Sequence, residues 1–110
     1  MISTDTLRFL IDKANATPGS IRDKEAAFCY YITEKIQAHH GDDGLRKAWF
    51  CAQHESYGQV AGTPLEKWAH TLSEYMSAFW GQVEAGNITG SLPGASIPQN
   101  GSHFSFFKDA

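Results

Sequence analysis

The chain has few cysteines, no cluster of basic residues and no long apolar run, and each absence excludes a class of protein. Its 2 cysteines, Cys29 and Cys51, cannot form the disulfide framework of a small secreted domain, so we expect a reducing cytoplasm. The 9 Lys and Arg are scattered among 12 Asp and Glu, with a net charge of -3. This balance argues against a nucleic-acid backbone as the main partner.

Membrane insertion and secretion are also not expected. No apolar stretch reaches the roughly 20 residues that are needed to cross a bilayer. The first residues lack the basic region and the apolar region that together make a signal peptide. We therefore expect a cytoplasmic protein with no membrane partner.

Apolar residues are nonetheless abundant, and their spacing is helical. Hydrophobic residues make up 42% of the chain and aromatics 13%, which is enough for one packed domain. Strand signals are poor, because valine and threonine nowhere alternate with polar residues over a useful length. Between Thr63 and Gly86, apolar residues recur on one arc of about 140°. They are Leu65, Trp68, Ala69, Leu72, Tyr75, Met76, Phe79, Trp80 and Val83.

Start and stop signals divide the chain into four expected helices. Thr63 as the N-cap, Pro64 and Glu66 form a strong start for the last helix, which ends at Gly86. Gly41 is expected to end the second helix as a left-handed C-cap. The expected helices run from residue 3 or 4 to about 16, from 20 to 40, from 42 or 43 to about 57, and from 63 to 86.

The caps of the first two helices are shorter signals. Ser3 or Thr4 can begin the first helix, and the segment Thr17-Pro18-Gly19 ends it. Ser20 can cap the second helix, with Asp23 as its acidic partner three residues later. Together these signals predict an all-α fold, namely a compact four-helix bundle.

Residues 87–110 have a different composition from the helical domain of residues 1–86. Glycine, proline and serine dominate as far as residue 102, which is typical of a linker. Phe104, Phe106 and Phe107 follow at the end of this polar tether. We expect this irregular, aromatic-tipped tail to pack on the helical domain or on a second copy of the chain.

The helical stripes leave several aromatic residues without a place in the core. On the third helix, Phe50 and Tyr57 lie about 120–140° from Leu45 of the core stripe, with His54 beside them. Phe9 and Tyr30 point away from the stripes of the first two helices. Two explanations compete. Either the tail phenylalanines cover Phe50 and Tyr57, or these aromatics bind another chain. The predicted partner-binding residues are Phe50, His54, Tyr57, Phe104, Phe106 and Phe107.

A line of small residues on the last helix is a second candidate surface. Ser73, Ser77 and Gly81 are four residues apart, so they lie on one side of the helix. A glycine inside a helix costs about 1 kcal/mol relative to alanine. The line is either an ordinary exposed face or a place of close contact, with the first helix or with a second copy. We predict an oligomer contact at these three residues.

The segment His39-His40-Gly41-Asp42-Asp43, followed by Cys51 and His54, has residue types that suit a metal site. Each residue also has a simpler explanation. Histidines suit a helix C-terminus, glycine caps that end, and aspartate begins the next helix. Zinc requires about four ligands. His39 and His40 would lie roughly three turns from Cys51, so we expect no metal and no cofactor.

Enzymatic and DNA-binding hypotheses find little support in the residues. Cys29 and Cys51 both lie mid-helix in aromatic surroundings that indicate a core, whereas a nucleophilic thiol requires a lowered pKa. His70 has Glu66 and Glu74 one turn away on either side, which is typical of a solvated helix face. The acidic residues on that face also argue against a helix-turn-helix motif that binds DNA. We predict no catalytic residue.

The most concrete function that these residues support is therefore protein binding without catalysis. We expect a small cytoplasmic inhibitor or adaptor that binds a larger protein or protein complex, or that assembles with itself as a homodimer. General experience with small acidic proteins adds the expectation that a phage or mobile element encodes it. The alternatives are a helical bundle that binds a small ligand and, less favoured, a metal-dependent or thiol enzyme.

Overall fold

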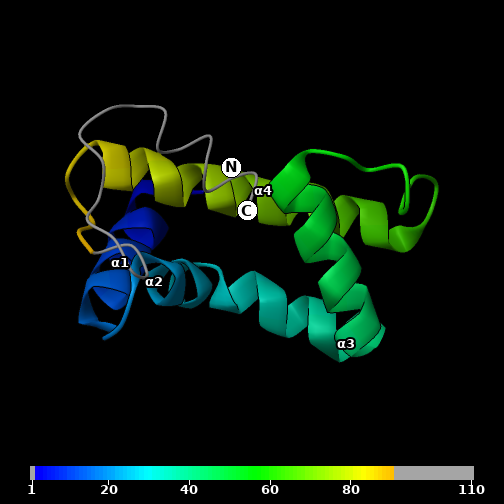
Figure 1. Ribbon diagram of the computed structural model, residues 1–110, viewed down its shortest axis with the longest axis horizontal. Coiled ribbons are helices and arrows are strands. Elements are labelled where there is room, and N and C mark those ends of the chain that lie inside the picture. The colour runs from blue at the N-terminus through cyan, green and yellow to red at the C-terminus, as the bar shows by residue number, and fades with distance from the viewer. Residues whose placement is uncertain (1, 91–110) are drawn as a thin grey trace. The chain divides into compact units, whose positions relative to one another are not determined.

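A computed structural model of the chain describes residues 2–90. Within this range the chain forms four helices and no strand, which confirms the all-α class (Figure 1). The helices are α1 (Thr4–Ala16), α2 (Ile21–Phe28), α3 (Tyr30–His54) and α4 (Pro64–Glu84). The described chain divides into two units, one of residues 2–28 and 77–90 and one of residues 29–76. The expected packing of the tail phenylalanines lies outside the described residues.

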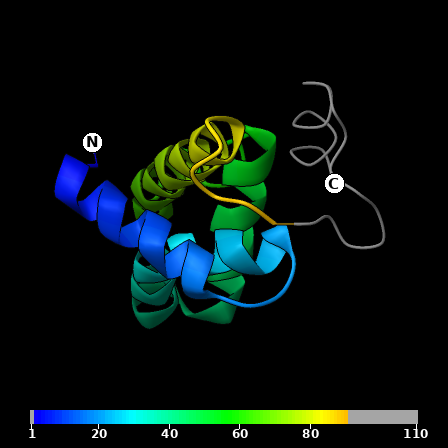
Figure 2. The same ribbon diagram turned by 90° about the vertical axis from the view of Figure 1, so that its left-hand side faces the viewer.

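Ser3 caps α1 as predicted, whereas at the start of α2 only the predicted contact of Asp23 is found, because the Ser20 hydroxyl donates to the Asp23 carboxylate at 3.3 Å. The hydroxyl of Ser3 accepts a hydrogen bond from the backbone N–H of Thr6 at 3.2 Å and so caps α1. The backbone N–H of Ser20 donates to the Asp23 carboxylate at 2.8 Å, which satisfies a donor at the start of α2. The short connection between the two helices is visible in Figure 2.

Lys24 closes the C-terminal end of α1, which the sequence did not predict. This side chain is buried, and its ammonium group donates to the carbonyl of Thr17 at 2.6 Å and to that of Ala14 at 3.3 Å. A helix C-terminus carries a partial negative charge and has carbonyls without helical partners, so a cation suits both needs. Lys24 thereby joins α2 to the end of α1.

The first unit has an apolar core that continues past the end of α4. Phe28 and Phe79 are both fully buried, and their rings meet edge to face with centroids 5.5 Å apart. Ile88 is 1% exposed although it follows α4. The side-chain amide of Asn15 donates to the carbonyl of Asn87 at 2.8 Å. Packing in this unit therefore includes the first residues of the segment that the sequence marked as tail.

The expected second helix is interrupted at Cys29, so that prediction is wrong in this detail. Cys29 has φ -92° and ψ 1°, which ends α2 after Phe28 and begins α3 at Tyr30. This backbone conformation is allowed to most residues and needs neither glycine nor proline. No breaker in the sequence marks the interruption.

Gly41 divides α3 as predicted, although not in the predicted conformation. Its φ of 73° is positive, but its ψ of -175° is extended rather than left-handed helical. Regular helical geometry is therefore lost at this residue, and α3 consists of two helical parts joined by a kink. Beyond the kink, a Cβ atom on Gly44 would lie 2.4 Å from the Cβ of His40. The kink thus requires glycine twice, once for its φ and once for close approach.

The third expected helix ends at His54 rather than at Tyr57. Glu55 adopts the left-handed conformation with φ 53°, and its N–H donates to the carbonyl of Cys51. The N–H of Ser56 reaches the same carbonyl at 3.1 Å, so two donors close the end of α3. Tyr57 consequently belongs to the connection between α3 and α4.

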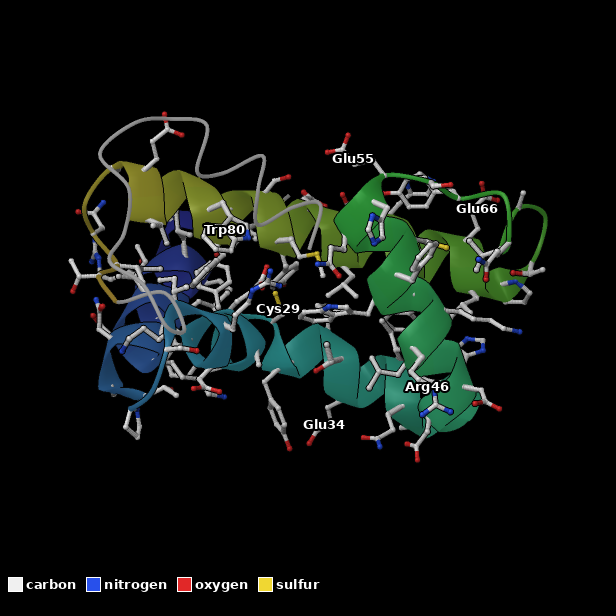
Figure 3. The ribbon with its side chains drawn as sticks, in the orientation of Figure 1. Cys29, Glu34, Arg46, Glu55, Glu66 and Trp80 are labelled. Carbon is white, nitrogen blue, oxygen red and sulfur yellow. The ribbon has the colours of Figure 1, made fainter. Side chains whose placement is uncertain are left out.

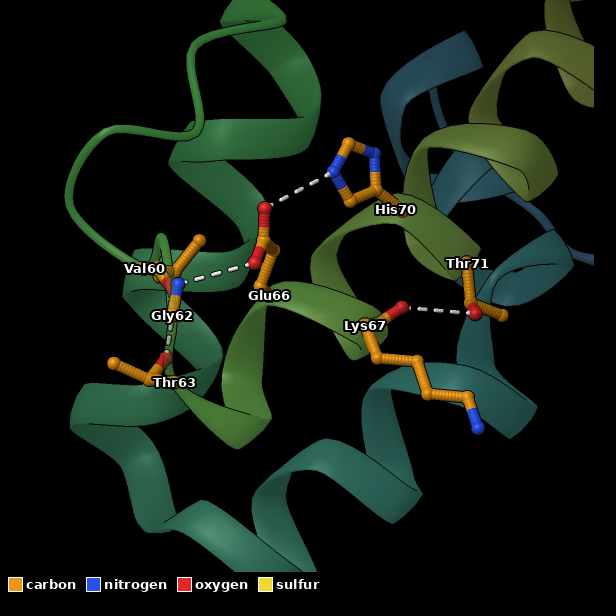
Figure 4. A network of polar contacts seen from close by, with 7 residues as sticks. All are labelled: Val60, Gly62, Thr63, Glu66, Lys67, His70 and Thr71. Carbon is orange, nitrogen blue, oxygen red and sulfur yellow. Dashed lines mark hydrogen bonds and ion pairs between the residues drawn. The ribbon is translucent and has the colours of Figure 1, made fainter.

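The start of α4 uses the predicted residues with different partners. The Glu66 carboxylate accepts the backbone N–H of Gly62 at 3.1 Å, one residue before the expected N-cap (Figure 4). The Thr63 hydroxyl does not cap the helix, because it donates to the carbonyl of Val60 at 2.7 Å. Val60 itself is buried, so this contact fixes the connection on the core of the second unit.

Candidate functional site

Four exposed residues follow one another along one side of the second part of α3. Asp43, Lys47, Phe50 and His54 are spaced by four, three and four residues, which places them on one helical line. We call these four residues the α3 stripe. The Phe50 side chain is 46% exposed, and its ring centroid lies 4.5 Å from that of His54. An apolar ring thus protrudes between a cation and an imidazole.

Of the two charged residues in the α3 stripe, Asp43 has an ion-pair partner and Lys47 has none among the described residues. Asp43 forms an ion pair with Arg46 one turn away, whose side chain extends outward from the helix (Figure 3). In the part of the chain that the structure describes, Lys47 forms no hydrogen bond and no ion pair. The uncompensated charge of the stripe is therefore the ammonium group of Lys47.

Tyr57 lies in a second pair, with His70, instead of joining Phe50. The Tyr57 and His70 rings are stacked with centroids 3.9 Å apart at an interplanar angle of 19°. The Nε2 atom of His70 is 3.8 Å from the Glu66 carboxylate, which also holds Gly62 (Figure 4). These contacts fasten the connection between α3 and α4 to the first turns of α4. Tyr57 is half-buried and has one face covered.

A groove of about 300 Å³ lies between the start of the second part of α3 and the start of α4. Its floor contains the buried residues Gly44, Val60 and Leu65. Two residues of the α3 stripe, Asp43 and Lys47, belong to its lining. The complete lining consists of His40, Asp43, Gly44, Lys47, Gln59, Val60, Thr63, Pro64 and Leu65.

The structure thus brings together only part of the predicted partner-binding set. Phe50 and His54 are in contact and exposed, whereas Tyr57 is paired elsewhere. Phe104, Phe106 and Phe107 lie outside the described residues. Lys47 and the groove were not predicted from the sequence. The spacing of the stripe could have identified Lys47, but the groove depends on where the connection lies.

The predicted oligomer contact is exposed at two of its three positions. Ser77 and Gly81 are exposed, and Ser73 is partly buried. A Cβ atom on Gly81 would have no described neighbour within 4 Å. Close packing inside the described chain therefore does not explain this glycine, and the predicted contact with a second copy stays a prediction.

Other exposed aromatic residues occur on both units. The sequence singled out Phe9 and Tyr30 as pointing away from the core, and these side chains are 62% and 51% exposed. Tyr31 is 55% exposed, and the ammonium group of Lys35 lies 4.7 Å from the centre of its ring. Exposure of an aromatic ring is therefore not confined to the α3 stripe, and exposure alone does not distinguish Phe50 from Phe9.

The thiols and the histidines do not assemble into a reactive site. Both cysteines are free and fully buried, and burial raises the pKa of the Cys51 thiol. A nucleophilic cysteine requires the opposite shift. Among the described residues, no three His, Cys, Asp or Glu side chains lie close enough together to hold a metal ion.

The first unit contains one buried carboxyl group that was not predicted from the sequence, that of Glu25. Glu25 is 4% exposed, and its carboxylate accepts a hydrogen bond from the indole N–H of Trp80 at 2.8 Å. Burial raises the pKa of Glu25, while the hydrogen bond from Trp80 and the charge of Arg22 oppose that rise. The group is enclosed by protein, so its role is in stability.

Comparisons with known proteins leave the function to be argued from these residues. No family model, no curated protein and no solved structure matches the chain. None of the described helices combines the length and the apolar character that a bilayer span requires.

Proposed function

We propose that this chain is a small, non-enzymatic interaction protein that acts in the cytoplasm by binding a larger protein. The observation that supports this proposal is the exposed Phe50 ring, held against His54 in the α3 stripe. Aromatic residues are enriched among those that dominate protein interfaces, because they bury a large area at low cost in conformational entropy.

The charges around Phe50 define the partner's chemistry. Lys47 and His54 flank the ring on the same helical line, and Lys47 has no described ion-pair partner. A complementary surface would offer an apolar pocket for Phe50 beside carboxylate groups. The net charge of -3 favours a protein over a nucleic acid as the partner. An inhibitor or adaptor role of this kind, for a phage-encoded or mobile-element-encoded chain, remains part of the proposal.

Two further parts of the proposal concern other residues. The tail residues Phe104, Phe106 and Phe107 are proposed to add to the same interface. Ser73, Ser77 and Gly81 are proposed to form a homodimer contact. Sedimentation equilibrium tests the dimer directly, because Gly81→Gln should return a dimer to its monomer mass of 12.1 kDa. An unchanged mass in that variant excludes Gly81 from any contact between copies.

The main experiment compares two exposed phenylalanines that lie in different units. Tagged wild type, Phe50→Ala and Phe9→Ala are used to capture partners from an extract of the organism that encodes the chain. We expect one protein to bind the wild type and Phe9→Ala but to be lost with Phe50→Ala. Both side chains are exposed, so both variants should keep the wild-type melting temperature. Equal loss in both variants, or equal retention, contradicts the proposal.

A second candidate function, binding of a small ligand, is favoured by the groove at Lys47. Its volume of about 300 Å³ lies at the lower end of the range for small-molecule sites. No comparable observation favours an enzyme, since the thiols are buried and the described histidines contact aromatic rings or line an open groove.

A further inference from the structure

The lining of the groove contains one positive charge that no negative group of the described residues compensates, the ammonium group of Lys47. Asp43 and Lys47 are the lining residues that carry a full charge at neutral pH, and Asp43 is paired with Arg46. Lys47 has no hydrogen-bond or ion-pair partner among the described residues. An anion bound in the groove would therefore supply the charge that the protein does not.

Other groups of the lining can donate hydrogen bonds. The side chains of His40 and Gln59 also form no hydrogen bond within residues 2–90. Leu65 is the second residue of α4, so the helix provides no acceptor for its backbone N–H. An oxygen-bearing anion could thus be held by one cation and by neutral donors on more than one element.

The floor of the groove determines what the rest of the ligand must be. Val60 and Leu65 are 1% and 8% exposed and present apolar surface, with Pro64 beside them. The groove is small, so it has room for a short stem and not for a large ring system. Inorganic phosphate has no apolar stem to place on this floor, so it should bind more weakly than a carboxylate on a short apolar stem.

We propose that this groove binds a carboxylate group on a short apolar stem, with Lys47 as its ion-pair partner. The stem lies on Val60 and Leu65. Two sources share this chemistry: a free short-chain organic acid, and a glutamate side chain of a protein partner. The inference rests on ligand binding in the groove, the second candidate function, and it shares Lys47 with the α3 stripe. It does not depend on Phe50, which does not line the groove.

The test is a titration of the full-length, ¹⁵N-labelled chain with sodium butyrate, followed by the backbone amide signals. Sodium chloride at matched ionic strength controls for screening, and butyramide controls for the uncharged shape. We expect saturable shifts at Gly44, Val60 and Leu65 with butyrate alone. Sodium phosphate should bind more weakly than butyrate. Equal shifts with chloride or with butyramide, or tighter binding of phosphate, overturn the proposal.

Matched lysine variants assign the site. Lys47→Ala should weaken butyrate binding about ten-fold, the loss expected for one charge-assisted hydrogen bond. Lys67→Ala is the control, because Lys67 is also exposed but does not line the groove, and its side chain points away from Val60 and Thr63 (Figure 4). Both lysines are exposed, so neither variant should unfold. Undiminished binding to Lys47→Ala overturns the proposal.

Two more arms separate the source of the carboxylate and the two proposed surfaces. The α-amide of N-acetylglutamate carries only a side-chain carboxylate, as a glutamate residue of a protein does. Binding tighter than that of butyrate therefore indicates a protein source, and binding no tighter than that of butyrate indicates a free acid. Phe50→Ala should leave the butyrate shifts unchanged, so the protein-binding proposal and the groove can each fail alone. A loss of butyrate binding in Phe50→Ala contradicts the placement of the site.

Discussion

The carboxyl group of Glu25 shows how a single residue makes the stability of this chain depend on pH. This side chain is buried away from water, and its carboxylate accepts a hydrogen bond from the indole N–H of Trp80. Burial disfavours the ionised form, which raises the pKa of Glu25 above its ordinary value of 4.5. A raised pKa in the folded state stabilises the protein below pH 4.5, and this contribution is lost as the pH rises through the folded pKa.

Replacement of this residue by its neutral isostere should therefore stabilise the chain at neutral pH. Glu25→Gln keeps an acceptor for Trp80 and removes the buried charge, so its melting temperature should exceed that of the wild type at pH 7. Each unit of pKa shift is worth about 1.4 kcal/mol. The advantage should shrink toward pH 4.5 and vanish below it. Melting temperatures measured by circular dichroism from about pH 3.5 to about pH 8 give this difference, because carboxyl groups titrate within that range.

Trp80→Phe provides the control for this assignment. It removes the hydrogen bond that opposes the pKa rise of Glu25, so it should steepen the loss of stability with pH. The double variant Glu25→Gln, Trp80→Phe should lose that extra pH dependence. If Glu25→Gln is less stable than the wild type at pH 7, the buried carboxylate is stabilising and the account is wrong.

Two helical glycines should respond to alanine in opposite directions. At Gly81 a new Cβ meets no described atom, so Gly81→Ala should raise stability by about 0.5–1 kcal/mol through helix propensity. At Gly44 a new Cβ would lie 2.4 Å from the Cβ of His40, which can move only with the backbone. Gly44→Ala should therefore lower stability by about 1–2 kcal/mol. Urea unfolding of both variants measures the sign. The same sign for both would refute the geometry of the kink.

At the scale of the element, the kink in α3 depends on the conformation of Gly41. Its φ of 73° with ψ of -175° belongs to a region that is essentially restricted to glycine. Gly41→Ala should cost about 1–3 kcal/mol, although a Cβ would have open space around it. Asparagine tolerates the left-handed helical region and not this one, so Gly41→Asn should cost about as much. Chemical unfolding of both variants distinguishes the two conformations, because a left-handed Gly41 would spare asparagine.

The same element shows what the sequence could predict and what it could not. Gly41 predicted the interruption of the helix, because glycine is the usual residue where the chain needs a positive φ. Cys29 gives no such signal, because its conformation requires neither glycine nor proline. Caps were predicted where a side chain binds its own helix start, as at Ser3. Contacts that join separate segments, such as that of Lys24 with α1, have no local signal.

The site follows the same division. The exposure of Phe50 and its contact with His54 follow from helical spacing, so the sequence predicted both. The stack of Tyr57 on His70 depends on the end of α3 at His54 and on the path of the connection. The groove depends on the same path, since Gln59, Val60 and Thr63 line it. Residues in a connection have no periodicity from which their neighbours can be read.

At the scale of the whole molecule, α4 contributes to both units. The second unit ends at Met76 and the first unit resumes at Ser77, and both residues lie within this single helix. Short isolated helices are marginal in water, because nucleation is costly and stability comes from packing. Unfolding of either unit should therefore fray α4 and remove packing surface from the other. We expect the two units to unfold in one cooperative transition.

Phe79 provides the test of this cooperativity, because it is fully buried and packs on Phe28 within the first unit. Phe79→Ala should cost about 3–5 kcal/mol, a large share of the roughly 5–15 kcal/mol that stabilises a domain of this size. Phe79→Leu should cost about 1–2 kcal/mol and keeps the test usable if the alanine variant does not fold. Hydrogen exchange should show protection falling equally at Ala14 in the first unit and at Ala48 in the second. Phe9→Ala, at an exposed position, should change neither amide. If Ala48 keeps its protection while Ala14 loses it, the units unfold separately and α4 does not couple them.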